Sequence, residues 1–131
     1  AALNEALARA DTVINLLPLT AATRGFFDAA RLARFKPGAG LVNLARGAHV
    51  VEADLLAALD AGRIGHAVLD VFQVEPLPPE HPFWSHERVT VLPHTAAQTD
   101  ARSAAALVAA NLRAWRAGRD PAHLVERARG Y

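Results

Sequence analysis

Four short runs of aliphatic residues, each separated from the next by a helix-like stretch, constrain the fold of this chain more than any other feature. The runs are nearly continuous in apolar residues, which is typical of strands that helices cover on both faces of a sheet. Strands that alternate with helices predict right-handed crossovers and therefore a parallel sheet. The sequence thus predicts an α/β fold with four adjacent parallel strands in sequence order. These strands are expected at residues 12–17, 40–45, 66–72 and 89–92.

Helical patterns fill the stretches between the strands. Leu3 and Leu7 lie four residues apart, as on one helix face. The third helix places Glu52 and Asp54 in its first turn and Gly62 at its carboxyl-terminal cap. This third helix is expected at residues 52–62. The helix before it is expected at residues 27–35, and a long final helix at 98–117.

Composition narrows the class of protein. The 131 residues are 52% hydrophobic and 21% charged, which is typical of a folded domain with a core. A formal net charge of +1 provides no electrostatic surface for nucleic acid, and no apolar run is long enough to span a membrane. The chain has no cysteine, so it has neither a disulfide nor a thiolate ligand, and no metal site is predicted. We expect a cytoplasmic protein without nucleic-acid or membrane partners.

Chemically active residues follow the strands of the predicted sheet. Pro18 follows the first strand and Arg46 the second, while the third contains Asp70 and leads to Glu75, and His94 follows the fourth. Because parallel strands point the same way, these residues are expected to share the edge of the sheet where ligands bind.

An arginine, a carboxylate and a histidine at one site suggest a division of labour. Arg46 would bind a carboxylate or polarise a carbonyl, and His94 would move a proton near neutral pH. An ionised Glu75 beside the histidine would favour the protonated imidazole.

Taken singly, each residue also has a simpler interpretation. Arg46 would form a surface salt bridge or cap a helix, His94 would be structural, Glu75 would be a solvated loop acid, and Asp70 would be a helix-capping acid. Their joint placement after successive strands favours a site. Three further histidines are interpreted as surface or packing residues: His49, His66 and His123.

Four segments carry a resemblance to a known family. "VINLLPLTAATRG", "LVNLARGAHVVEADLLAAL", "AVLDVFQVEPLP" and "VTVLPHTAA" closely resemble the D-2-hydroxyacid dehydrogenases. Within that family, "LARGAHVVE", "EPLPPEHPFW" and the closing "RARGY" are most similar to the bacterial glyoxylate/hydroxypyruvate reductases of the A type. The resemblance covers essentially the whole chain.

This resemblance implies an oxidoreductase that reduces a small 2-oxo acid, glyoxylate or hydroxypyruvate, with NADPH or NADH. It assigns Arg46 to substrate binding, His94 to proton donation and Glu75 to the histidine's partner. The catalytic residues are then Arg46, Glu75 and His94, and the residues near the nicotinamide are Pro18, Ala45, Arg46, Asp70 and Ala96.

The resemblance also implies the organisation of the protein. The chain would be the second half of a Rossmann-type NAD(P)-binding domain, and residues 118–131 would form a tail that docks on a substrate domain. Family members are more than twice as long, and the phosphate-binding loop and the residues that select NADP or NAD precede this segment. A homodimer is expected for the full-length protein, and little activity for this chain alone. Two alternatives stay open: a non-catalytic fragment or scaffold module, and another family activity, such as that of a phosphoglycerate dehydrogenase.

Overall fold

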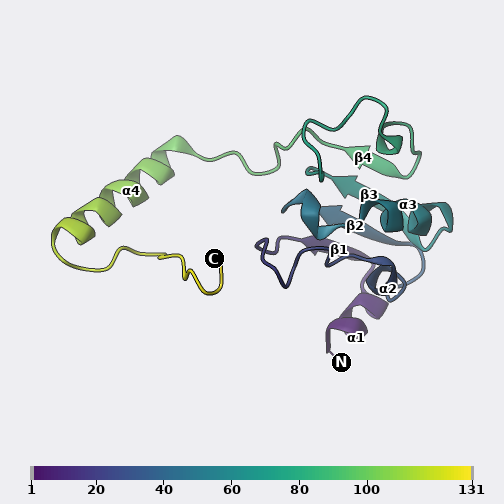
Figure 1. The fold of residues 1–131 in the computed structure, drawn as a ribbon, viewed down its shortest axis with the longest axis horizontal. Coiled ribbons are helices and arrows are strands. Elements are labelled where there is room, and N and C mark those ends of the chain that lie inside the picture. Colours follow the sequence, from purple (N-terminus) through teal and green to yellow (C-terminus); the bar gives the residue numbers. More distant parts are fainter. Residues whose placement is uncertain (1, 131) are drawn as a thin grey trace. The chain divides into compact units, whose positions relative to one another are not determined.

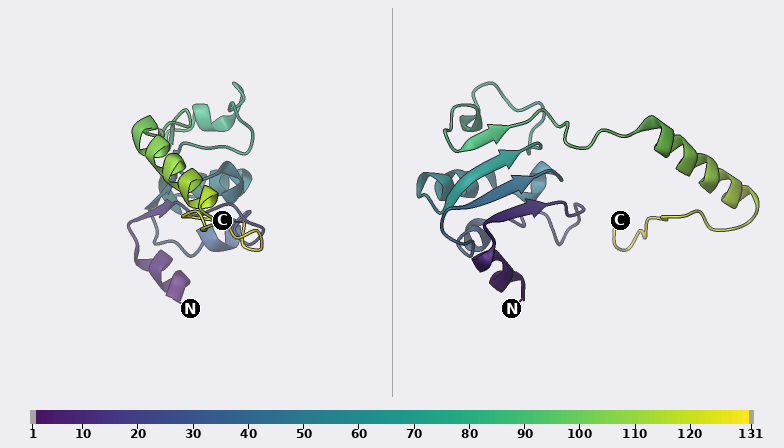
Figure 2. Two further views of the ribbon diagram at one scale, coloured as in Figure 1. Left: turned by 90° about the vertical axis from the view of Figure 1, so that its left-hand side faces the viewer. Right: turned by 180° about the vertical axis from the view of Figure 1, so that it is seen from behind.

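The computed structural model describes residues 2–130, and its contacts divide the chain into two compact units, residues 1–96 and 97–131. The first unit contains a four-stranded sheet in the order β1-β2-β3-β4 (Figure 1). All three strand pairs are parallel, and the four arrowheads point in one direction in the right-hand view of Figure 2. The predicted topology is confirmed. The strands are β1 (Thr12–Asn15), β2 (Ala39–Asn43), β3 (Ile64–Leu69) and β4 (Val89–Val91).

The first two strands end earlier than the apolar runs suggested, and in each case an asparagine is the last residue. Asn15 is only 2% exposed, and its side-chain oxygen accepts a hydrogen bond from the Leu17 N–H at 3.2 Å. Asn43 is fully buried and does the same for the Ala45 N–H at 3.2 Å. A side chain that satisfies the main chain two residues ahead turns the backbone out of the ladder. The residues after each strand are therefore loops.

Helices and short 3₁₀ turns connect the strands, and one helix is shorter than expected. Of the helix predicted at 27–35, only α2 (Ala29–Leu32) forms. Asp28 caps it by accepting a hydrogen bond from the Arg31 N–H at 2.8 Å, while Phe27 instead forms a β-bridge with Val50. The remaining elements of this unit are α1 (Ala2–Arg9), η1 (Gly47–His49), α3 (Glu52–Asp60) and η2 (Pro82–Trp84).

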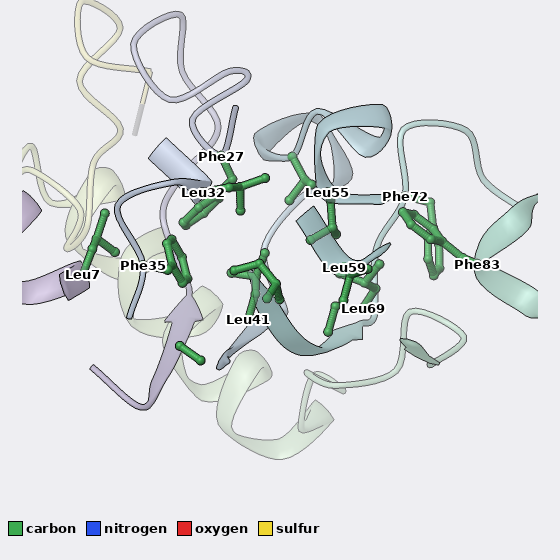
Figure 3. Packing of buried hydrophobic residues seen from close by; sticks show 14 of the residues in the cluster. Leu7, Phe27, Leu32, Phe35, Leu41, Leu55, Leu59, Leu69, Phe72 and Phe83 are labelled. Atoms are coloured by element: carbon green, nitrogen blue, oxygen red, sulfur yellow. The ribbon is translucent and has the colours of Figure 1, made fainter. Parts of the chain in front are cut away.

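The core lies between the sheet and helices α2 and α3. Leu55 and Leu59 of α3 are fully buried and lie beside Leu41 of β2 and Leu69 of β3 (Figure 3). Full burial of one such side chain is worth about 1.5–3 kcal/mol. On the opposite face, within residues 2–96, Ile14 stays 58% exposed, so this unit covers one face of the sheet more completely than the other.

The second unit is built on α4 (Ala101–Arg116). Asp100 caps the helix by accepting a hydrogen bond from the Ser103 N–H at 2.8 Å. The side chain of Asn111 exchanges two hydrogen bonds with the main chain of Ala122, so the segment after residue 118 folds back on its own helix. The second compact unit thus includes both α4 and the predicted tail, and it begins at residue 97. Docking of residues 118–131 on a substrate domain stays a prediction. Between residues 2 and 130, no helix has the length and hydropathy needed to cross a bilayer.

Candidate active site

Arg46 lies in the loop that follows β2 and is exposed. Its backbone is extended, with φ −142° and ψ 143°, and its Nη1 donates a hydrogen bond to the carbonyl oxygen of Ala45 at 2.6 Å. The salt bridges found among residues 2–130 do not include this arginine. The simple interpretation as a surface salt bridge therefore receives no support, and the planar group is available for an anion from outside the chain.

A pocket of about 420 Å³ lies beside this arginine, between the loops that follow β1 and β2. Three residues predicted to lie near a nicotinamide, Pro18, Ala45 and Arg46, line it together. The other four lining residues are all leucines, so the pocket combines an apolar wall with one cation. Its full lining is Leu16, Leu17, Pro18, Leu19, Leu44, Ala45 and Arg46.

Glu75 and His94 form a direct pair. The Nδ1 atom of His94 lies 2.7 Å from Oε2 of Glu75, and the two side chains are 50% and 35% exposed. The other carboxylate oxygen of Glu75 accepts a hydrogen bond from the Phe72 N–H at 2.9 Å, which fixes the orientation of the carboxylate. Because Nδ1 is bound to Glu75, the ring turns its Nε2 atom away from the carboxylate. Such an arrangement sets the orientation of a histidine that moves protons.

The pKa of Glu75 reflects its surroundings. Partial burial raises it, but hydrogen bonds from the Phe72 N–H and from His94 lower it, as do the positive charges of His94 and Arg46, and the net pKa lies below the usual value for a glutamate. Glu75 is therefore ionised at neutral pH.

Asp70 supports the loop that contains His94. Its carboxylate is 1% exposed and accepts hydrogen bonds from the Thr95 N–H at 2.8 Å and the Ala96 N–H at 3.0 Å. His94 itself has a φ of 54°, in the left-handed region that few residues other than glycine adopt. Two hydrogen bonds on the next two residues help to hold this conformation. Asp70 and Ala96 thus lie together, and their contact with a cofactor stays a prediction.

A second pocket, of about 450 Å³, opens beside the Glu75–His94 pair. Its walls are mostly apolar side chains from the proline-rich loop and from the end of β4. The lining residues are Phe72, Glu75, Pro76, Leu77, Trp84, Val91, Leu92, Pro93 and His94.

Gly47 is a requirement of the site that the sequence reasoning missed. A Cβ atom on Gly47 would lie 1.9 Å from the carbonyl carbon of Phe72 and 2.5 Å from the nitrogen of Gln73. The loop of Arg46 therefore packs directly on the main chain that leads to Glu75. The glycine directly after the arginine was the available signal.

We predict that Gly47→Ala destabilises the protein strongly. The added methyl group meets backbone atoms that have no flexible end to move, so the free energy of unfolding is expected to fall by about 3 kcal/mol. Gly40→Ala is the control, because its Cβ would have an ordinary contact at 3.5 Å from Oγ1 of Thr12. Urea unfolding of both variants measures the difference. Equal stability of the two variants would contradict this account of Gly47.

Comparison with known proteins identifies the family. The family described as "D-isomer specific 2-hydroxyacid dehydrogenase, NAD binding domain" matches residues 1–96. Glyoxylate/hydroxypyruvate reductase A of Yersinia enterocolitica is 50% identical over 119 residues, which are 91% of this chain and 38% of that protein. The chain thus spans about two fifths of the length of this relative.

Two solved structures share the fold closely. A D-isomer specific 2-hydroxyacid dehydrogenase from Xanthobacter autotrophicus, in complex with NADPH and MES, superposes with a TM-score of 0.96 at 45% identity, covering 99% of this chain and 54% of that one. An NADPH-dependent glyoxylate/hydroxypyruvate reductase from Sinorhizobium meliloti, in complex with NADP and sulfate, gives a TM-score of 0.93 at 40% identity, covering 98% and 42%. The chain therefore belongs to the D-isomer specific 2-hydroxyacid dehydrogenase family, and its residues 1–96 are NAD-binding domain sequence of that family.

Proposed function

We propose that this chain supplies the catalytic half of the nucleotide domain of a reductase that converts a small 2-oxo acid, glyoxylate or hydroxypyruvate, to the D-2-hydroxy acid. The observation that carries the proposal is the pair of Glu75 and His94, whose Oε2 and Nδ1 atoms lie 2.7 Å apart. The same compact unit contains Arg46, which takes part in none of the salt bridges found among residues 2–130. Besides a hydride donor, such a reduction requires a proton donor for the carbonyl oxygen and a cation that binds the substrate carboxylate. The relative from Yersinia enterocolitica has a name that describes this activity.

The pocket beside Arg46 fits one end of a nicotinamide cofactor. Pro18 and Ala45 offer an apolar surface for a flat ring, and Arg46 stands at the same pocket. The two solved relatives described above contain NADPH or NADP, which favours NADP as the cofactor. No glycine-rich phosphate loop opens a helix in this sequence, so we propose that the preceding part of the whole protein binds the pyrophosphate.

The residues of this chain then have separate tasks. Arg46 binds the carboxylate of the 2-oxo acid through its planar group and orients the carbonyl. His94, protonated and held at Nδ1 by Glu75, donates a proton from Nε2 to the carbonyl oxygen as that oxygen becomes a hydroxyl. Glu75 stays ionised and stabilises the imidazolium. A nicotinamide cofactor, when bound, would supply the hydride that the carbonyl carbon needs.

The assay of this proposal follows the absorbance of NADPH in the whole protein with glyoxylate, with hydroxypyruvate, and with acetaldehyde as a control without a carboxylate. We expect turnover with the two acids and a kcat/KM lower by a factor on the order of 10² for the aldehyde. The 131-residue chain alone is expected to show negligible turnover, because little holds the cofactor. Equal rates with glyoxylate and acetaldehyde would contradict the proposed role of Arg46, and absence of turnover with every 2-oxo acid would contradict the proposed activity. Assembly of the whole protein as a homodimer is a further proposal, which its mass in solution tests.

A further inference from the structure

His49 is a buried histidine behind the candidate site: it contacts the two loops that line the pocket beside Arg46 but is not among the lining residues of either pocket. It ends the 3₁₀ turn η1 (Gly47–His49) and is 0% exposed. Its Nδ1 atom lies 3.1 Å from the carbonyl oxygen of Arg46, and its Nε2 atom lies 3.3 Å from the carbonyl oxygen of Pro18, 31 residues away in the sequence. One ring thus touches the main chains of both loops that line the pocket beside Arg46.

Each of these carbonyl oxygens is also fixed by another side chain. The Arg46 oxygen accepts hydrogen bonds from Nδ2 of Asn43 at 3.1 Å and from the His49 N–H at 3.1 Å. The Pro18 oxygen accepts one from the hydroxyl of Thr23 at 2.7 Å. The His49 ring contacts both oxygens directly. Two other connections run beside it: the Asn15–Asn43 hydrogen bond at 2.9 Å, and the hydrogen bond from the Gly25 N–H to the carbonyl oxygen of Ala48 at 2.8 Å.

The location makes a purely space-filling role a poor explanation. A buried imidazole costs free energy unless its polar atoms are hydrogen-bonded. Here each nitrogen lies within hydrogen-bonding distance of a carbonyl oxygen; the neutral ring donates to one of them, and only the protonated ring donates to both. A leucine would fill similar space without that cost but would remove the contact of one side chain with both carbonyl oxygens. The contacts of the ring with the two loops therefore explain why this buried residue is polar. The loops on either side carry the side chain of Arg46 and the apolar wall of Pro18.

We propose that His49 is a positioning residue that fixes the loop of Arg46 against the loop of Pro18, and so sets where the substrate carboxylate lies relative to the nicotinamide. The inference rests on the proposed function, and it assigns His49 no contact with either ligand. The residue acts through Arg46. Its replacement should therefore impair binding and orientation of the 2-oxo acid more than binding of the cofactor.

A double-mutant cycle in the whole enzyme tests the proposal. His49→Leu is expected to lower kcat/KM for glyoxylate by a factor on the order of 30, since a displaced positioning group costs 10- to 100-fold. The KM for NADPH should change by less than about threefold. In an Arg46→Lys background the same replacement should cost less than about threefold, because the group it positions is already lost. His66→Leu is the matched control: this exposed histidine bonds only Oγ1 of Thr90, at 2.8 Å, and both kinetic constants should stay unchanged.

The outcomes separate a positioning role from a structural one. An equal loss with His49→Leu in both backgrounds, or a loss confined to thermal stability, would overturn the proposal. If His49→Leu does not fold, His49→Gln replaces it; the amide keeps one donor, and its smaller loss must again shrink in the Arg46→Lys background.

Hydrogen exchange of the 131-residue chain supplies a readout that does not depend on activity. The amides of Ala45 and Gly47, and those of Leu19 and Thr20, should exchange faster in His49→Leu and His49→Gln than in His66→Leu. Unchanged exchange in both loops would refute the positioning role even if the enzyme reduces 2-oxo acids. Faster exchange in both loops, in an enzyme that reduces no 2-oxo acid, would support the connection and refute only the proposed function.

Discussion

His94→Gln is expected to lower kcat for reduction of glyoxylate by a factor on the order of 10³ in the whole enzyme, because the reaction loses its proton donor. A glutamine amide does not give up a proton near neutral pH, although it can keep a hydrogen bond to Glu75. Binding of NADPH should change little, since His94 lines the pocket beside Glu75 and not the one beside Pro18. Steady-state kinetics and a cofactor titration measure the two quantities.

The control for this experiment is His66→Gln, which replaces an exposed histidine on β3 and should leave kcat unchanged. A loss of less than about tenfold for His94→Gln would mean that the proton reaches the substrate by another route. Glu75 would then be the partner of a structural histidine only.

Arg46→Lys is expected to lower kcat/KM for glyoxylate by a factor on the order of 10², although the charge is kept. A lysine presents a point charge where a planar guanidinium can form two parallel hydrogen bonds to a carboxylate. The exposed Arg34, which follows α2 in the chain, offers a control, because Arg34→Lys should change nothing measurable. Acetaldehyde should lose less than about threefold with Arg46→Lys, because it has no carboxylate to bind.

A change of less than about threefold with glyoxylate would mean that Arg46 is structural. Equal losses with glyoxylate and acetaldehyde would mean that Arg46 acts on the carbonyl or on the loop, and not on the carboxylate.

The sheet could be predicted from the sequence because its order depends on local patterns. Four apolar runs separated by short helical stretches favour a parallel sheet whose strands lie in sequence order, and the structure has this order. The short α2 could not be predicted, because the bridge between Phe27 and Val50 is a contact between distant segments. The first two strands stop at Asn15 and Asn43, which bond to each other at 2.9 Å as well as to the loops ahead. The repeated asparagine at the end of "VIN" and "LVN" was visible in the sequence, but its meaning depends on the pairing of the two strands.

The residues of the candidate site also differ in whether the sequence alone could predict their roles. Residues placed directly after a strand, such as Arg46 and His94, could be located from the topology alone. Gly47 could not be recognised as a close contact, because nothing local shows that the main chain of Phe72 passes beside it. His49 was interpreted as a surface or packing residue, since the carbonyl oxygen of Pro18 reaches it only through the fold. Such roles depend on contacts across the sheet, which the periodicity of a sequence does not contain.

The central claim is that His94 donates the proton and that Glu75 keeps it protonated, and the dependence of kcat/KM on pH tests this most directly. The pKa of Glu75 lies below its usual value, so the carboxylate is charged throughout the neutral range and favours the imidazolium. Reduction needs protonated His94, so its rate should fall as pH rises through a midpoint. Oxidation of the hydroxy acid needs the neutral ring and should rise through the same midpoint.

Glu75→Gln removes the negative charge and keeps the shape of the side chain. Without that charge the imidazolium loses the ion pair that stabilises it, so reduction is expected to lose rate at a lower pH. The account predicts that both pH profiles of the whole enzyme, measured as kcat/KM for glyoxylate reduction and for glycolate oxidation, move to lower pH in Glu75→Gln. Profiles that stay in place or move to higher pH would contradict the assignment of Glu75 and His94 as the proton-donating pair.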